Sequence, residues 1–279
     1  MTVATATPVG ERVLSLTGIN KRFGAVQVLT DIHLEVNAGE VVALVGDNGA
    51  GKSTLVKIIA GVYQPDSGEM EFAGRKVSVA GPSEAQALGI ATVYQDLALC
   101  DNLDVVANLF LGQEKQHGAS LDEVEMEKES WRLLRTLSAK IPSVRIPIAA
   151  LSGGQRQTVA IARSLVGAPK IVMLDEPTAA LGVAQTAEVL NLIERLKENG
   201  LGVIVISHNM ADVQAVSDRI VVLRLGRNAA DFDTRKVTTQ ELVAAITGAS
   251  DNVVTARASR QEGASTEAAA ATPEEGSDG

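Results

Sequence analysis

A short glycine-rich segment carries the clearest chemistry in this sequence. It reads Gly46-Asp47-Asn48-Gly49-Ala50-Gly51-Lys52-Ser53-Thr54 and matches G-x-x-x-x-G-K-[ST] in full. Glycines let the backbone curl until its N–H groups point at a phosphate. Lys52 supplies a charge between β- and γ-phosphates, Ser53 offers a hydroxyl to Mg²⁺, and Thr54 can contact an α-phosphate. The segment therefore predicts a site for a nucleoside triphosphate.

The flanking residues favour a strand before this segment and a helix after it. Glu40–Val45 is short, apolar and rich in β-branched residues, which is typical of a buried strand. Thr54–Ala60 has helical spacing and stops at Gly61 and Pro65. A glycine-rich turn that merely joins a strand to a helix is the alternative. The segment alone also fits a GTPase or a small-molecule kinase, although no guanine-reading Asn-Lys-x-Asp motif occurs.

Two acidic residues end another apolar run. Lys170–Asp175 predicts a second buried strand, and Glu176 follows directly. An Asp at the end of such a strand can hold Mg²⁺ through water, and the adjacent Glu176 can act as general base towards an attacking water. An acidic cluster that complements a helix dipole is the alternative.

The composition limits the class of protein. The chain has 279 residues, of which 46% are hydrophobic and 3% aromatic, so aliphatic side chains must build the core. The net charge of -9 argues against a chain that coats nucleic acid, because binding a phosphate backbone needs a basic face. The single cysteine, Cys100, fits a reducing compartment. No signal peptide and no apolar run of roughly 18 to 20 residues is found, so if the protein serves a membrane we expect it to dock on one rather than cross it.

The remaining pattern alternates strands with helices, which predicts a mostly parallel sheet with crossover helices. From about 101 to 140 the spacing is helical, and Trp131 is expected to pack in the core of that region. The other predicted elements are the strands Val13–Leu16, Leu29–Val36, Ile90–Tyr94, Leu201–Ser207 and Ile220–Leu225, and the helices Asp122–Leu137 and Thr186–Glu198.

A second motif resembles a known family. The segment Leu151-Ser152-Gly153-Gly154-Gln155-Arg156-Gln157 resembles the signature of ABC ATPases, and its place between the phosphate loop and the acidic strand matches their order. Ser152 and the glycines open a predicted helix, Arg156–Ser164, whose start can hold a γ-phosphate. In the family that phosphate belongs to the nucleotide of the other subunit. The alternative is an ordinary Ser cap before a helix.

The resemblance gives roles to three isolated residues. Gln95 is implied to contact Mg²⁺ and water and to link to the membrane subunit. His208 is implied to reach the γ-phosphate and help position the attacking water. Phe23 lies where the family stacks an aromatic ring under adenine, with a core Phe as the alternative. Together the motifs imply an ATPase with ATP and Mg²⁺ as ligands.

The resemblance also implies the fold and its divisions. These are an α/β P-loop NTPase core with a mostly parallel sheet, an N-terminal antiparallel β subdomain and an inserted helical subdomain at about 96–165. The nucleotide-binding domain is expected over 11–248. Residues 1–10 and 249–279 are expected to be disordered, the latter because its Ala, Glu, Ser and Gly cannot bury enough apolar surface.

The segment Glu176–Val183 (EPTAALGV) resembles the monosaccharide-importer branch, which handles ribose-, xylose- or fructose-like sugars. Most ABC ATPases have Asp where this chain has Gly182, so either the coupling of the two sites is impaired or Gly182 marks the subfamily. The chain shows one ATPase half where many members of the branch fuse two.

The resemblance therefore implies pairing with a copy of itself or a paralogue. It also implies an integral membrane permease and, indirectly, an extracytoplasmic sugar-binding protein, at the cytoplasmic face of the membrane. A groove beside Gln95 is expected to seat a short permease helix on Leu103, Val105, Leu109 and Phe110, unless these residues simply pack the helical subdomain. A soluble ABC ATPase acting on DNA or ribosomes, and a regulatory subunit with weak turnover, stay open as alternatives.

Overall fold

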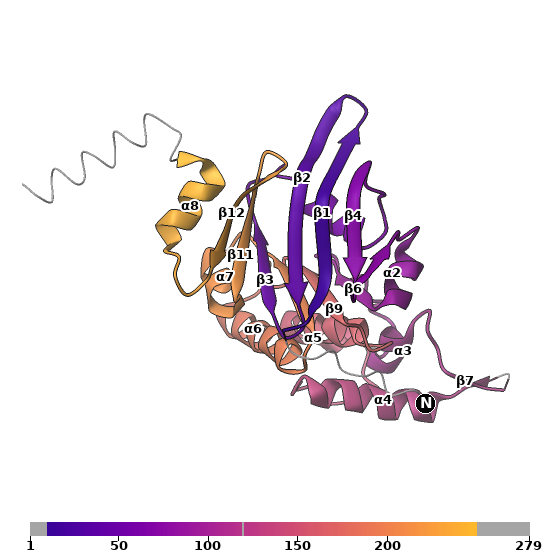
Figure 1. Ribbon diagram of the computed structural model, residues 1–279. Coiled ribbons are helices and arrows are strands. Elements are labelled where there is room, and N and C mark those ends of the chain that lie inside the picture. The colour runs from indigo at the N-terminus through magenta and orange to yellow at the C-terminus, as the bar shows by residue number, and fades with distance from the viewer. Residues whose placement is uncertain (1–9, 119, 250–279) are drawn as a thin grey trace, which may run out of the picture.

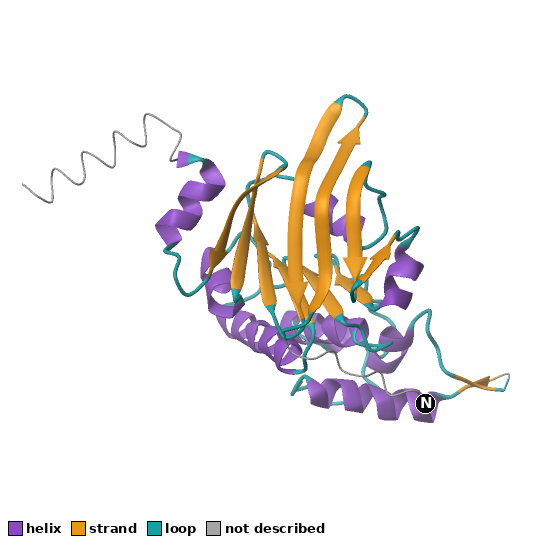
Figure 2. Ribbon diagram, in the orientation of Figure 1, coloured by secondary structure: helices purple, strands orange, loops and turns teal. Residues whose placement is uncertain are grey.

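Two sheets form the framework of the computed structural model, which describes residues 10–118 and 120–249. The six-stranded sheet runs β12-β11-β3-β10-β9-β6, and all neighbouring pairs are parallel except β11 with β12. Its strands are β12 (Arg227–Asp233), β11 (Arg219–Arg224), β3 (Val41–Val45), β10 (Gly202–Ile206), β9 (Ile171–Asp175) and β6 (Ile90–Val93). The predicted mostly parallel sheet is confirmed (Figure 2).

The second sheet is antiparallel and runs β2-β1-β4-β5. Its strands are β1 (Arg12–Phe23), β2 (Val26–Asn37), β4 (Ser67–Phe72) and β5 (Arg75–Val77). Figure 1 shows β1, β2 and β4 standing together beside the parallel sheet. The N-terminal antiparallel region expected from the resemblance is therefore present.

Helices cover the parallel sheet, and α3 to α6 gather at its lower side in Figure 1. A short hairpin, β7 (Gln116–His117) with β8 (Ser120–Leu121), projects between α3 and α4. The helices are α1 (Lys52–Ile59), α2 (Pro82–Leu88), α3 (Val105–Phe110), α4 (Glu123–Thr136), α5 (Gly153–Ser164), α6 (Val183–Glu198), α7 (Met210–Val216) and α8 (Thr239–Thr247), with a 3-10 turn at Ile148–Ala150.

Each central strand sends alternate side chains to opposite faces, as a period of two requires. Ile204 and Ile206 of β10 join the cluster that includes the antiparallel sheet and α1. Val203 and Val205 of the same strand join the cluster of α3 to α6. Because both faces are covered, the strand is apolar throughout, which explains why its sequence reads as a continuous apolar run. Trp131 packs partly buried against the second cluster.

Several elements carry too weak a pattern to be predicted, namely α2, α7, α8, β4, β5, β7, β8 and β12. The predicted disordered segments, 1–10 and 249–279, lie outside the described residues apart from Gly10 and Ala249. Within the two described stretches, no helix has the length and apolar character needed to span a bilayer.

Candidate functional site

The phosphate loop joins β3 to α1, and glycine is required at two of its positions. Gly46 and Gly51 have φ of 148° and 102°, values that favour glycine. A Cβ on Gly46 would lie 2.1 Å from the Leu223 carbonyl oxygen, and one on Gly51 would lie 2.4 Å from the Leu29 side chain. The loop therefore closes tightly against β2 and the end of β11.

Lys52 begins α1 and folds back over the loop. Its Nζ donates to the carbonyl oxygens of Gly46 at 2.6 Å and Asp47 at 3.0 Å. Burial lowers the pKa of Lys52, and the carboxylates of Glu176, Asp47 and Asp175 oppose that shift. The ammonium group is thus held inside the loop that the sequence predicts to bind phosphates.

A cavity of about 290 Å³ lies over the loop. Gln95 follows β6, and Asp175 and Glu176 end β9, so these side chains arrive from neighbouring parallel strands at one edge of the sheet. The lining residues are Val28, Asn48, Gly49, Ala50, Gly51, Lys52, Ser53, Thr54, Gln95, Asp175, Glu176 and Ile206. The structure thus brings most of the predicted loop together with three of the predicted polar residues.

The acidic pair and His208 form a connected group. His208 follows β10, which pairs with β9, and its Nδ1 lies 2.9 Å from Glu176 Oε1. Glu176 has φ of 50°, and its N–H donates to the Ile206 carbonyl at 2.8 Å. Burial, then the neighbouring Glu176 charge, raises the pKa of Asp175, and Lys52 and Lys57 oppose the shift. Glu176 thus combines a strained backbone with a carboxylate oriented by His208 at a cavity wall, which is typical of a functional site.

Phe23 lies at the end of β1 and is 42% exposed, so the alternative that it is a core residue is wrong. Its ring packs edge-on against Tyr63 with 5.1 Å between ring centroids. Lys21 Nζ lies 5.5 Å from the centre of the same ring. An exposed, fixed aromatic face of this kind can stack on a planar base.

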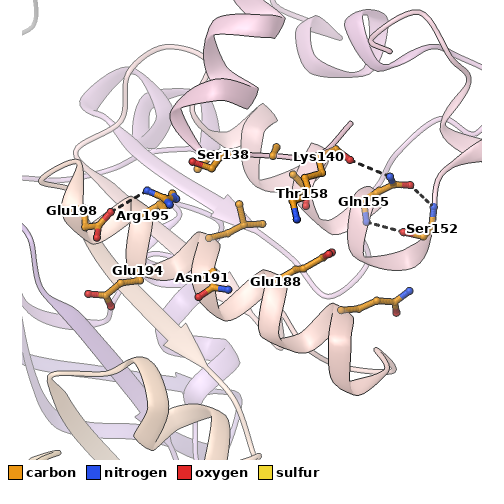
Figure 3. A pocket seen from close by; sticks show the side chains of 14 residues that line it. Ser138, Lys140, Ser152, Gln155, Thr158, Glu188, Asn191, Glu194, Arg195 and Glu198 are labelled. Carbon is orange, nitrogen blue, oxygen red and sulfur yellow. Dashed lines mark hydrogen bonds and ion pairs between the residues drawn. The ribbon is translucent and has the colours of Figure 1, made fainter. Parts of the chain in front are cut away.

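The segment 151–157, here called the signature region, lies at the start of α5. Ser152 Oγ accepts from the Gln155 N–H at 3.3 Å, and the Gln155 side chain accepts from the Ser152 N–H at 3.0 Å. This reciprocal cap confirms the predicted role of Ser152 as a helix cap. The Gln155 amide also donates to the Lys140 carbonyl at 3.1 Å, which ties the signature region to the turn after α4 (Figure 3).

The signature region faces a separate, open pocket of about 720 Å³ between α5, α6 and the turn at 137–140. Ser152, Gln155, Glu188 and Asn191 line it, and no residue of the phosphate loop does (Figure 3). Gly153 and Gly154 lie close to α6, because a Cβ on Gly154 would be 3.2 Å from Gln185. Within one chain, the signature region and the phosphate cavity are therefore two distinct sites.

The phosphate cavity has the donors that a nucleotide with Mg²⁺ needs. Glycine at 46 and 51 lets the loop keep its tight shape over the cavity, and Lys52 supplies a cation. Among the described residues no cluster of three or more His, Cys, Asp or Glu could hold a metal alone. Ser53, Gln95 and Asp175 give only a partial oxygen set, which suits an ion that also binds phosphate oxygens.

The groove beside Gln95 differs from the one predicted. Val105, Leu109 and Phe110 are fully buried, so they pack the helical region, and the prediction that they seat a partner helix is wrong. Leu103 is partly buried and is absent from the groove walls. A groove of about 260 Å³ does lie nearby, lined by residues that include Ala91, Tyr94, Leu111, Gln113, Ala160, Arg163 and Ser164.

Three residues of these sites are not marked by any motif in the sequence. Tyr63 supports Phe23, Val28 lines the phosphate cavity, and Arg163 lines the groove. Tyr63 and Val28 lie far along the chain from the residues they contact, and Arg163 occupies an ordinary helix position. Since no local motif marks them, only the fold reveals them.

The comparisons with known proteins agree with this arrangement. The profile of the ABC transporter family matches residues 29–179. The xylose/arabinose import ATP-binding protein XylG of Sulfolobus acidocaldarius is 47% identical over 215 residues, or 77% of this chain and 86% of that protein. The fructose import ATP-binding protein FrcA of Rhizobium meliloti is 41% identical, over 86% of this chain and 96% of its own.

A putative ribose/galactose/methyl galactoside import ATP-binding protein of Burkholderia lata is 40% identical over 85% of this chain. This chain covers 46% of that relative, or about half its length. Among solved structures, the ADP conformation of MJ1267, an ATP-binding cassette of an ABC transporter, gives a TM-score of 0.75 at 26% identity, with coverage of 85% and 99%. A dimeric cassette, MJ0796 bound to ADP and Pi, gives 0.67 at 26% identity, with coverage of 80% and 100%.

Proposed function

The chain belongs to the ABC transporter family, and from that membership we propose that it hydrolyses ATP to power the uptake of a simple sugar through a membrane permease. One observation carries the ATPase assignment. Four neighbouring parallel strands, β3, β10, β9 and β6, place the phosphate loop, His208, Asp175 with Glu176, and Gln95 at the same edge of the sheet. That edge is where open α/β sheets bind their ligands.

The phosphate loop holds the substrate ATP. The backbone N–H groups of Gly46 to Thr54 surround the phosphates, and the start of α1 adds its positive dipole end. Lys52 exchanges its contacts with the Gly46 and Asp47 carbonyls for phosphate oxygens. Phe23, supported by Tyr63, stacks on the adenine ring.

Glu176 is the general base. Its carboxylate accepts a proton from the attacking water, and His208 fixes its orientation through the contact at Oε1. Ser53, Gln95 and Asp175 would hold Mg²⁺, which would neutralise charge on the phosphates. Gln95, which lines the same cavity, also reaches the attacking water.

A second copy of the chain, or a paralogue, completes each site. Ser152, Gly153, Gly154 and Gln155 lie outside the phosphate cavity of their own chain, so they are free to meet a γ-phosphate bound to the partner. Solved relatives include a dimeric cassette. Binding of ATP then favours the closed pair, and hydrolysis removes the bridging phosphate and releases it.

The permease docks in the groove lined by Tyr94, Leu111, Gln113 and Arg163, at the cytoplasmic face of the membrane. Tyr94 and Leu111 are 40% and 47% exposed and can pack against a short apolar helix. Tyr94 of the groove directly precedes Gln95 in the chain, so a docked helix would act on the segment that lines the phosphate cavity. This docking groove replaces the one predicted from the sequence, whose residues on α3 are buried.

Sugar as the cargo rests on relatives whose names refer to xylose or arabinose, fructose, and ribose or galactose import. An extracytoplasmic sugar-binding protein would deliver that cargo to the permease. Specificity then lies in those two partners, while this chain supplies the energy.

Two measurements test the proposal. The purified full chain should release phosphate from ATP only when Mg²⁺ is present, and chelation by EDTA should abolish the release. Co-expression with a candidate permease and binding protein should give sugar uptake that a Lys52→Ala variant lacks. Stable co-purification with nucleic acid instead of a permease would favour the alternative of a soluble ABC ATPase.

A further inference from the structure

Arg163 connects the signature helix to the chain that follows Gln95. It lies at the end of α5, and its Nη1 and Nη2 donate to the carbonyl oxygens of Ala98 at 2.9 Å and Leu97 at 2.6 Å. The guanidinium is half-buried, and burial lowers its pKa, although an arginine remains charged in proteins. A planar fork with donors in fixed directions fits two adjacent carbonyls, whereas a lysine ammonium is a point charge on a flexible stem.

The segment 95–100 is thereby held at two points. At its far end, the buried Asn108 of α3 accepts from the Cys100 N–H at 2.7 Å and donates to the Cys100 carbonyl at 3.0 Å. In the middle, Ala98 has φ of 47°, a conformation that L-residues rarely adopt without surrounding support. Arg163 binds the carbonyl of this strained residue, so it supplies part of that support.

The same arginine touches the docking groove. Arg163, Ala160 and Ser164 all line it, and their spacing places them on one face of α5. The helix extends from Gly153 to Ser164, 12 residues, so its two ends lie roughly 17 Å apart at 1.5 Å per residue. A displacement of the end that carries Arg163 is therefore transmitted to Ser152 along a single rigid element.

We infer that Arg163 is a positioning residue that couples the segment bearing Gln95 to the signature region, so that a partner in the groove and a nucleotide in the cavity act on one helix. This inference rests on the proposed ATPase and docking functions. Arg163 does not contact the nucleotide. Arg163 affects hydrolysis through Gln95, in the segment to which it is bonded, and through Ser152, at the start of its own helix.

A double-mutant cycle on ATP hydrolysis by the full chain tests this coupling. We expect Arg163→Ala to lower kcat about tenfold and to leave the KM for ATP within about twofold, because the phosphate loop is unchanged. We expect the double variant with Gln95→Ala to be no slower than Gln95→Ala alone. If the two effects multiply instead, Arg163 acts independently of Gln95 and the inference is overturned.

The matched control is Arg135→Ala, which also removes an arginine bond to a backbone carbonyl, that of Trp131, but within its own helix α4. It should leave kcat within about twofold in either background. Arg163→Lys, which keeps the charge, should stay several-fold below the native chain, because an ammonium on a flexible stem lacks the fixed planar donor geometry of the guanidinium. Full rescue by lysine would contradict the role assigned to the planar fork.

Hydrogen exchange on the nucleotide-free full chain tests the inference without relying on turnover. Arg163→Ala should speed exchange of the amides at 95–100 about tenfold and also raise exchange in the first turn of α5. Loss of protection at 95–100 alone would show a local brace and overturn the coupling. If Arg163→Ala does not fold, Arg163→Lys and Arg163→Gln give the same comparison. An inactive native chain would refute the proposed ATPase, while these exchange rates would still decide the connection.

Discussion

The walls of the phosphate cavity come from the ends of several neighbouring strands, whereas the signature region consists of one helix start and the turn beside it. In the cavity, backbone carbonyls hold Lys52 and the Glu176 N–H, and Gly46 and Gly51 have no room for a Cβ. In the signature region, Ser152 and Gln155 hold each other through two hydrogen bonds, and the pocket they face is open. The first site is shaped within one chain by its own fold, and the second presents groups to a partner.

The largest expected effect lies in the cavity. Glu176→Gln removes the proton acceptor and retains the size of the side chain, so phosphate release should fall about 10²- to 10⁴-fold. ATP binding should persist, because the loop and Lys52 are unchanged, and the variant should form a stable ATP-dependent dimer. Phosphate-release kinetics and size-exclusion chromatography with and without ATP measure the two effects. Near-normal turnover would mean that Glu176 is not the base.

The next prediction separates the two roles of Ser152. Ser152→Ala should lower the free energy of unfolding by about 1 kcal/mol, because the cap of α5 is lost. Ser152→Asp keeps a capping oxygen and should leave stability near that of the native chain, yet its charge would repel a γ-phosphate and lower turnover roughly 100-fold. Denaturant unfolding and ATPase assays on both variants give the comparison. If Ser152→Asp hydrolyses ATP normally, the signature region does not face phosphate.

Glycine substitutions contrast tight and open positions of the phosphate loop. Gly51→Ala should destabilise the fold by about 2 kcal/mol and abolish ATP binding, since its φ of 102° and its contact with Leu29 both oppose a side chain. Gly49→Ala is the control, because it also has positive φ, 81°, but open space around a Cβ. Unfolding curves and nucleotide titrations distinguish them. Equal behaviour of both variants would show that backbone strain alone matters.

The buried negative charge of Asp175 lowers the free energy of unfolding. The pKa of Asp175 is raised by burial and by Glu176, so the folded chain binds this proton more tightly than the unfolded chain does. The contribution of Asp175 is therefore most favourable at low pH and is lost as pH rises from the ordinary value near 3.8 through the raised one. Asp175→Asn should abolish Mg²⁺-dependent hydrolysis and yet raise the unfolding midpoint, by more at pH 7 than at pH 4. An equal shift at both pH values would contradict this.

The local motifs explain how far the sequence could predict the structure. The phosphate loop, the strand ending in Asp175 and the cap at Ser152 depend on neighbours along the chain, and each was predicted at its position. The docking groove was misplaced because α3 has six residues, too few for periodicity to reveal its buried face. Val105 and Leu109 are buried through packing with α4 and α5, which lie far along the chain.

Other features that the sequence does not predict also have a weak local pattern or depend on contacts between distant elements. The edge strand β12 alternates weakly between exposed and partly buried residues, so its pattern was too faint to read. The pairing of Phe23 with Tyr63 and of Arg163 with Leu97 and Ala98 joins separate elements. Placement at one sheet edge fixes the geometry of the site residues, and the variants test their chemistry.

The smallest expected effect concerns Gly182, which is the N-cap residue of α6. Its N–H donates to Gln185 Oε1 at 3.3 Å, and Gln185 also packs beside Gly154 of the signature region. Gly182 has φ of -74° and open space around a Cβ, so an aspartate fits there without strain. Gly182→Asp should stabilise the fold by a few tenths of a kcal/mol through a better cap.

We expect turnover of Gly182→Asp to stay within about twofold of the native chain, because glycine and aspartate differ little as caps and the cavity is untouched. That result would favour Gly182 as a mark of the subfamily. A several-fold gain in ATPase activity would instead show that glycine impairs coupling between the two sites. Val183→Ala is the control, since Val183 is 90% exposed and follows directly in the chain. A similar gain from Val183→Ala would assign the effect to the exposed turn as a whole, because that change leaves the residue at position 182 in place.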